Sequence, residues 1–180
     1  KGILIIHSPS DCMDFYKDTP QRQRAQDAPL AETDIEFKWN YFNPDKEGDL
    51  EKKLEEAGCS CDTPEPCRSD FKAWESEITA LEIGEEDAIS DKGQEVYNLL
   101  QQRGINNVII MGVHTNMCVL GRPFGLRNMS RYGKNVVLMR DMTDTMYNSR
   151  MRPFVNHFTG TDLVVEHVEK YMCPTVTSTI

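Results

Sequence analysis

The residues best suited to carry chemistry lie in the segment Met111-Gly-Val-His-Thr-Asn-Met-Cys-Val119. An apolar run, Val108 to Gly112, predicts a buried strand, and a helix is predicted from about Asn116 to Arg131. Cys118 would then lie in the first turn of that helix, where the positive end of the helix dipole favours a thiolate over a thiol. Backbone N–H groups without helical partners in the same turn could hold an oxyanion. The pattern indicates a cysteine nucleophile, and a buried cysteine that only fills space is the alternative.

Three apolar runs predict the strands that would position this cysteine. The run from Gly2 to His7 is unbroken, which favours a strand buried on both faces, and Asn135 to Arg140 predicts a third strand. Strands that alternate with helices predict a three-layer α/β/α fold with a mainly parallel sheet. Ligands of such sheets bind outside the carboxyl ends of the strands. The candidate pocket residues at these ends are His7, Asn116 and Asp141.

The predicted helices have recognisable starts and stops. Asp91-Lys-Gly-Gln94 resembles a capping box, and Gly104 would end the helix that follows it. A last helix is predicted to begin at Thr159 or Thr161 and to run through Tyr171. Pro123 lies inside the helix that would carry Cys118, and an internal proline costs about 3 kcal/mol. That helix should therefore be kinked or irregular.

The four histidines have structural explanations as well as functional ones. A hydrogen-bonded histidine at a strand end is the alternative for His7, and His114 could offer its imidazole as well as its backbone. His157 and His167 fall in the last helical region as surface or packing residues. Turn formation and capping account equally well for Asp141, and for Asp144 close behind it.

The segment Gly112-Val-His-Thr-Asn-Met-Cys-Val119 resembles the G-V-x-T-[DN]-x-C-V signature of the isochorismatase-like cysteine hydrolases, which include the nicotinamidases. The resemblance continues through Arg140-Asp141-Met-Thr-Asp144 and Thr161 to Glu169, and it is weak across the cysteine-rich middle of the chain. It implies hydrolysis of an amide-type C–N or related bond in a small molecule, with Cys118 as the nucleophile. It also implies a homo-oligomer and no cofactor.

The resemblance further implies a catalytic triad of cysteine, lysine and aspartate and a cis peptide bond in the signature loop. That bond maps to Val113-His114, and the oxyanion would accept from the backbone N–H groups of His114 and Cys118. The metal site of the nicotinamidases needs an aspartate and paired histidines in the N-terminal half. Only His7 stands there, so a catalytic metal is not expected.

Two members of the implied triad have no match in the sequence. The family's lysine would fall in Leu81-Glu-Ile-Gly-Glu-Glu-Asp87, which has no lysine, while Lys72 comes too early and Lys92 too late. The family's aspartate ends the first strand, whereas Ile3 to His7 resembles the second strand.

A strand and helix of about 30–40 residues are therefore expected to precede these 180 residues, because the strand from Val108 to Gly112 would otherwise face an empty slot in the sheet. The alternative is that Asp11 or Asp14 serves as the base and another segment fills the slot.

Composition is typical of one globular domain spanning residues 1–180, which the resemblance implies is a hydrolase domain. With 20 basic and 29 acidic residues the formal charge is −9, which argues against nucleic acid and acidic lipid as partners. No apolar run approaches the ~20 residues that cross a bilayer. No secretory signal is recognisable, which favours the cytoplasm over secretion. Residues 19–72 form a polar, proline-containing elaboration in which Cys59, Cys61 and Cys67 are expected to be reduced rather than bound to metal or to each other.

Two other classes of function remain open from the sequence. The chain could be a binding protein that keeps the fold and the thiol without turnover, as the unmatched lysine allows. It could also be a thiol redox protein in which Cys118 pairs with a second cysteine.

Overall fold

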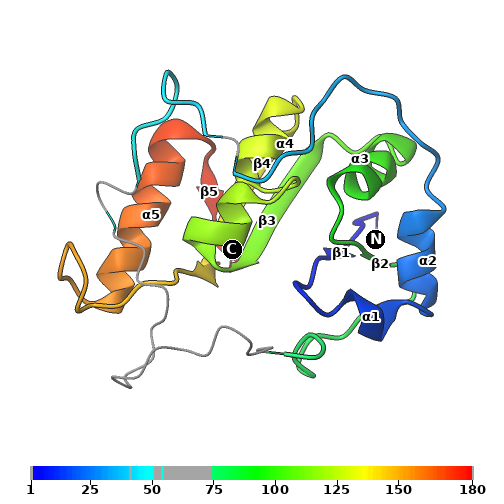
Figure 1. Cartoon of the computed structure of the whole chain (residues 1–180), viewed down its shortest axis with the longest axis horizontal. Coiled ribbons are helices and arrows are strands. Elements are labelled where there is room, and N and C mark those ends of the chain that lie inside the picture. Colours follow the sequence, from blue (N-terminus) through cyan, green and yellow to red (C-terminus); the bar gives the residue numbers. More distant parts are fainter. Residues whose placement is uncertain (1, 41, 51–53, 55–73, 180) are drawn as a thin grey trace. The chain divides into compact units, whose positions relative to one another are not determined.

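The structure is a computed structural model that describes residues 2–40, 42–50, 54 and 74–179. The chain divides into two compact units: unit 1 comprises Lys1–Asp34 and Cys67–Ile105, and unit 2 comprises Ile35–Pro66 and Asn106–Ile180. The predicted elaboration, residues 19–72, includes segments assigned to both units, and much of its second half lies outside the described residues. Each unit has its own parallel sheet beside helices, so the fold class is α/β, as predicted (Figure 1).

Unit 1 is built around two short parallel strands. The strand β1 pairs with β2, with Ile6 opposite Ala88 and His7 opposite Ile89. Thr19 caps α2, since its hydroxyl accepts the N–H of Arg22 at 3.2 Å, and Pro20 occupies the first helical position. The elements of unit 1 are β1 (Ile6–His7), α1 (Met13–Tyr16), α2 (Pro20–Gln26), β2 (Ala88–Ile89) and α3 (Gly93–Gln102).

The predicted burial of the first strand on both faces is wrong. Ile3 is 82% exposed and Ile5 50%, whereas Leu4 and Ile6 pack against a core of alanines and Leu99. This alternation follows from the sheet, because among the described residues β1 pairs with β2 alone and only one of its faces is covered by α2 and α3.

The predicted capping box of α3 is also wrong. The N-cap residue is Lys92, whose side chain makes no capping bond, and the hydroxyl of Ser90 accepts the N–H of Lys92 at 3.1 Å. Gln94 turns away and donates to the Asn98 side chain and to the backbone of Ala31. The predicted stop is confirmed at Gly104, which has a φ of +62°.

Unit 2 carries the longer strands, in the order β3-β4-β5. The strands are parallel, and η1, α4 and α5 lie along the sheet (Figure 1). The elements are β3 (Asn107–Val113), η1 (Thr115–Val119, a π-helical turn), α4 (Leu126–Arg131), β4 (Asn135–Asp144), α5 (His157–Tyr171) and β5 (Thr175–Val176). Its fully buried side chains include Leu120, Leu126, Leu138, Tyr147, Val164 and Val168.

A bulge in β4 shapes the end of this sheet. Ile110 is paired with Leu138, but Gly112 is paired with Thr143 and Val113 with Asp144. The extra residues in β4 lengthen it beyond the predicted end at Arg140. Bulges of this kind redirect side chains at the edges of sheets. Here the bulge brings Thr143 and Asp144 beside the last residues of β3.

The helix predicted from Asn116 to Arg131 is interrupted, as Pro123 led us to expect. The chain leaves η1 and starts again at α4, with Gly125 as the N-cap residue. A Cβ atom at Gly125 would lie 2.7 Å from the carbonyl oxygen of Val119, so the close backbone approach requires glycine. The predicted caps of α5 at Thr159 or Thr161 are wrong, because Asn156 accepts the N–H of Thr159 at 2.9 Å and starts the helix earlier.

Among the described residues, β3 ends the sheet and pairs with β4 alone. Its apolar side chains alternate, and Ile109, Met111 and Val113 are 51–59% exposed. The expected fully buried strand is therefore half-covered. Within the described part of the chain, no helix has the length and apolarity needed to cross a membrane.

Candidate active site

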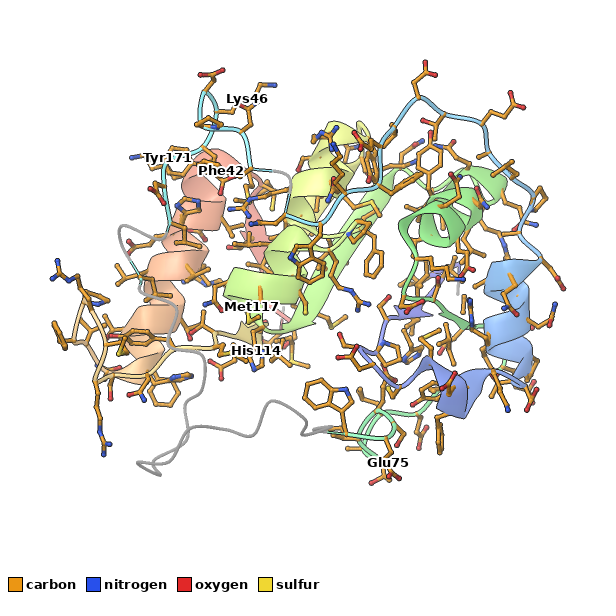
Figure 2. All side chains as sticks on the ribbon, viewed as in Figure 1. Phe42, Lys46, Glu75, His114, Met117 and Tyr171 are labelled. Atoms are coloured by element: carbon orange, nitrogen blue, oxygen red, sulfur yellow. The ribbon has the colours of Figure 1, made fainter. Side chains whose placement is uncertain are left out.

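The turn after β3 carries the predicted nucleophile. The peptide bond Val113-His114 is cis, at the position where the resemblance places one. The carbonyl of His114 accepts the N–H groups of Met117 at 3.0 Å and Val119 at 3.1 Å, which closes the π-helical turn. Figure 2 labels the side chains of His114 and Met117. Cys118 lies inside this turn and is half-buried. Single π-helical turns are uncommon and often occur at functional sites.

Threonine hydroxyls fasten the turn to the end of β4. Thr115 is fully buried, and its hydroxyl donates to the carbonyl of Asp144 at 2.9 Å. The hydroxyl of Thr143 donates to the carbonyl of Gly112 at 2.7 Å and lies 2.6 Å from that of Thr115. Since each hydroxyl has one proton, the two protons are shared among three contacts.

Asn116 makes a second connection to the same segment. Its amide nitrogen donates to the carbonyl of Met146 at 3.0 Å, and its amide oxygen accepts the N–H of Met146 at 3.0 Å. Both ends of the amide are thus committed to backbone. The predicted pocket residue Asn116 is therefore placed beside Cys118, but its side chain holds the turn in place.

Asp144 and His157 meet where β4 ends and α5 begins. The Nε2 atom of His157 lies 2.8 Å and 3.0 Å from the two carboxylate oxygens of Asp144, and Nδ1 lies 2.9 Å from the carbonyl of Tyr147. Thr161 donates to the same carboxylate at 3.0 Å. The Tyr147 carbonyl, opposed by partial burial and aided by Asp144, raises the pKa of His157. Burial would raise the pKa of Asp144, but the bonds from His157 and Thr161 outweigh it and lower that pKa.

The imidazole of His114 lies close enough to this pair for its charge state to be affected. Burial lowers the pKa of His114, the Asp144 carboxylate opposes that shift, and His157 adds to it. The ring of His114 is therefore mainly neutral at pH 7. A neutral imidazole can both donate and accept a hydrogen bond.

A cavity of about 220 Å³ in unit 2 adjoins the turn at Asn116. In its wall, Arg127 from α4 is bonded to Glu47 at 2.5–3.1 Å and to Asn40. Glu47 also accepts from Nε2 of His167 at 2.8 Å. Burial would raise the pKa of Glu47, but its bonds to His167 and Arg127 lower it. The cavity is lined by Asn40, Phe42, Asp49, Leu50, Leu54, Asn116 and Arg127.

The other predicted residues have structural partners of their own or fall outside the described residues. Asp141 is inside β4 and not after it, and its exposed carboxylate accepts the N–H of Ser178 at 2.9 Å and 3.0 Å. The hydroxyl of Ser178 also donates to this carboxylate at 2.5 Å, and it is this bond first, and the N–H bonds second, that lower the pKa of Asp141. These contacts account for the residue without a ligand. His7 belongs to unit 1, where its ring lies between Glu77 and Asp87. Cys59, Cys61, Cys67 and Lys72 lie outside the described residues.

The remaining lysine and cysteines are placed by the structure. Lys92 has its Nζ 3.7 Å from Glu95 at the start of α3. Cys12 is 1% exposed and Cys173 7% exposed, and burial raises the pKa of Cys173 to about 11. Of the three cysteines in the described part of the chain, Cys118 alone is more than marginally accessible. The described part of the chain contains no group of three or more histidine, cysteine, aspartate or glutamate side chains arranged to hold a metal ion.

The sequence alone does not single out the Asp144–His157 pair or Glu47 with Arg127. Asp144 is explained there as a turn residue, and His157 as a surface or packing residue. The available signal was the run Arg140 to Asp144, which forms part of the family resemblance. For Glu47 and Arg127, 80 residues apart, no local pattern exists that could join them.

Neither the family models nor the curated protein sequences include a match to this chain. Among solved structures, the chain is similar to an isochorismatase-like hydrolase from Alkaliphilus metalliredigens, with 16% sequence identity and a TM-score of 0.44. The match covers 66% of this chain and 63% of that hydrolase, so the chain spans less than two thirds of the hydrolase's length. The similarity is one of fold alone.

Proposed function

We propose that this chain is a cysteine-dependent hydrolase that cleaves an amide-type C–N or related bond in a small molecule, with Cys118 as its nucleophile. One observation carries the proposal: the only accessible cysteine of the described residues lies in a tightly held turn at the carboxyl end of β3. Parallel sheets bind ligands at this edge. The G-V-x-T-[DN]-x-C-V signature is the supporting observation from the sequence.

The proposed reaction has two steps. The sulfur of Cys118 attacks the carbonyl carbon of the amide, the C–N bond breaks, and the amine leaves with a proton, so that a thioester remains on the enzyme. Water then attacks the thioester, the C–S bond breaks, and the acid is released while the thiol regains its proton. Backbone N–H groups of His114 and Cys118 are the proposed donors to the oxyanion in both steps.

Limiting iodoacetamide at neutral pH, followed by peptide mapping, tests the nucleophile. Cys118 should be labelled first, because Cys12 and Cys173 are buried and the Cys173 thiol has a pKa of about 11. The mapping should also cover Cys59, Cys61 and Cys67. Preferential labelling at any of these five cysteines would contradict the proposal.

Turnover of a panel of small amides tests the reaction itself. Cys118→Ser should abolish hydrolysis while leaving the circular dichroism spectrum unchanged, since the substitution is nearly isosteric. Cys173→Ala is the matched control and should retain activity. A reactive Cys118 without turnover of any amide would favour a binding protein, and a peroxide-induced disulfide at Cys118 would favour a redox protein.

A further inference from the structure

The two ring nitrogens of His157 hold both ends of one short segment, residues 144–147. Nε2 bonds the carboxylate of Asp144 and Nδ1 bonds the carbonyl of Tyr147, all at 2.8–3.0 Å. An ionised carboxylate and a carbonyl can only accept hydrogen bonds. Both nitrogens must therefore carry a proton for both contacts to form, and the ring is then an imidazolium.

The same segment provides the backbone that holds the turn of Cys118. The carbonyl of Asp144 accepts from Thr115 at 2.9 Å, and the N–H and carbonyl of Met146 bond the amide of Asn116 at 3.0 Å each. A short path of hydrogen bonds thus leads from His157, through residues 144–147, to the two residues that begin the turn. Cys118 follows two positions after Asn116.

His157 itself is fixed by the start of α5. Asn156 caps the helix, and Thr161, one turn further on, donates to Asp144 at 3.0 Å. The helix lies so close to Tyr147 that a Cβ atom at Gly160 would be 2.3 Å from the Tyr147 ring. A side chain that begins on a capped and closely packed helix is well placed to hold a neighbouring loop.

We propose that protonated His157 is a positioning residue, which holds segment 144–147 and through it the turn that carries Cys118. The proposal builds on the proposed function, because it concerns the same turn, but it assigns a role to a residue that need not touch the substrate. Loss of the ring proton would remove one of the two contacts and loosen the turn.

The charged and titratable groups that face His157 set the pH range of this effect. Among the described residues they are Asp144 from β4 and His114 from the turn after β3. The pKa of His157 lies above its ordinary value of 6.5, chiefly because of the Tyr147 carbonyl. Both contacts of His157 should therefore be complete below pH 6.5, and the contact that needs the second ring proton should be lost as the pH rises through the raised pKa.

Hydrogen exchange of peptides covering residues 113–119, corrected for the intrinsic pH dependence of exchange, tests the proposal. In the wild-type protein, protection should fall as the pH rises through the pKa of His157. His157→Gln, which cannot donate from both sides as a cation, should lower protection about threefold at neutral pH and remove the pH dependence. His157→Arg, always charged and able to donate to both acceptors, should restore protection at every pH.

Glu166→Gln, an exposed change on the same helix, is the matched control and should leave protection unchanged. Equal protection in the wild-type protein and His157→Gln would overturn the proposal, and so would a pH profile that His157→Arg does not flatten. Iodoacetamide labelling of the same samples separates the two proposals. Preferential labelling of Cys118 with unchanged exchange contradicts the role of His157 alone, whereas absent labelling contradicts the proposed function alone.

Discussion

Each unit places a histidine against carboxylates, but the surroundings of the two histidines differ. In unit 1, the ring of His7 bonds Glu77 at 2.9 Å and Asp87 at 3.1 Å, and the three side chains are only 9–15% exposed. In unit 2, the His157 side chain is 32% exposed and that of Asp144 is 52% exposed. Both imidazoles face acceptors on both sides, so burial is the main difference between them.

That difference separates a structural histidine from a responsive one. A buried cation between two carboxylates cannot be removed without leaving charge uncompensated in a poorly solvated place. A half-exposed pair contributes little to stability, because water competes for both partners. Such a pair can nevertheless change its contacts with pH at little cost to the fold. The His7 cluster should therefore govern the stability of unit 1, and His157 the local order of the Cys118 turn.

The largest expected effect is that of His7→Leu on unit 1. Removing the cation leaves Glu77 and Asp87 close to each other and largely buried, which should lower the free energy of unfolding by about 3 kcal/mol. The chain has two tryptophans, Trp74 in unit 1 and Trp39 in unit 2. Urea unfolding followed by fluorescence in a Trp39→Phe background therefore reports on unit 1.

The matched change in unit 2 is His157→Leu in a Trp74→Phe background. It should cost less than about 1 kcal/mol, since the pair with Asp144 is half-exposed. Equal losses in the two backgrounds would contradict the distinction between a buried and an exposed histidine. Each tryptophan substitution alone provides the reference for its own background.

The next effect in size is the pH dependence of unit 1. The bond to Glu77 raises the pKa of His7, burial opposes the shift, and Asp87 adds to it. A histidine with a raised folded-state pKa stabilises the protein fully below its unfolded value, near 6.5, and that contribution is lost as the pH rises through the folded value. Urea unfolding of unit 1 should thus show stability falling above pH 6.5.

His7→Leu should lack this decline, because the titrating group is gone. The comparison of the two pH profiles removes the contributions of other groups that titrate in the same range. If both proteins lose stability in parallel above neutral pH, His7 is not the group responsible.

Much of unit 2 follows from local patterns in the sequence. The apolar runs at Val108 and Asn135 predicted β3 and the first part of β4, and the position of Cys118 after a strand followed from their order. Parallel pairing and the α/β class followed from the alternation of strands and helices. These features depend on residues close together in the chain, which is why the sequence was sufficient.

The parts that were wrong or missed depend on distant partners. The third strand was predicted to end at Arg140, whereas pairing with Gly112 and Val113 through a bulge extends β4 to Asp144. The alternating burial of Ile3 to Ile6 depends on which faces are covered, and an unbroken apolar run carries no record of that. His157 and Asp144 meet because the loop between them folds back, and no periodicity describes such a loop.

The smallest expected effect on stability is that of Asp144→Asn, compared with Asp87→Asn in unit 1. Asp87 is 12% exposed and also accepts the N–H of Gly84 at 2.7 Å, so its change should cost about 2 kcal/mol. Asp144→Asn should cost less than about 1 kcal/mol, because the carboxylate is half-exposed. Both values come from urea unfolding in the matching single-tryptophan backgrounds.

Asp144→Asn should change the hydrogen-exchange protection of residues 113–119 more clearly than it changes the free energy of unfolding, since the two quantities depend on different contacts. The amide oxygen of asparagine can still accept from His157, but the charge that helps to keep the ring protonated is lost. The pKa of His157 should therefore fall, and the protection of residues 113–119 should decline at a lower pH than in the wild-type protein. A large loss of unfolding free energy with an unchanged exchange profile would reverse the comparison, because Asp144 would then be structural in the way that Asp87 is.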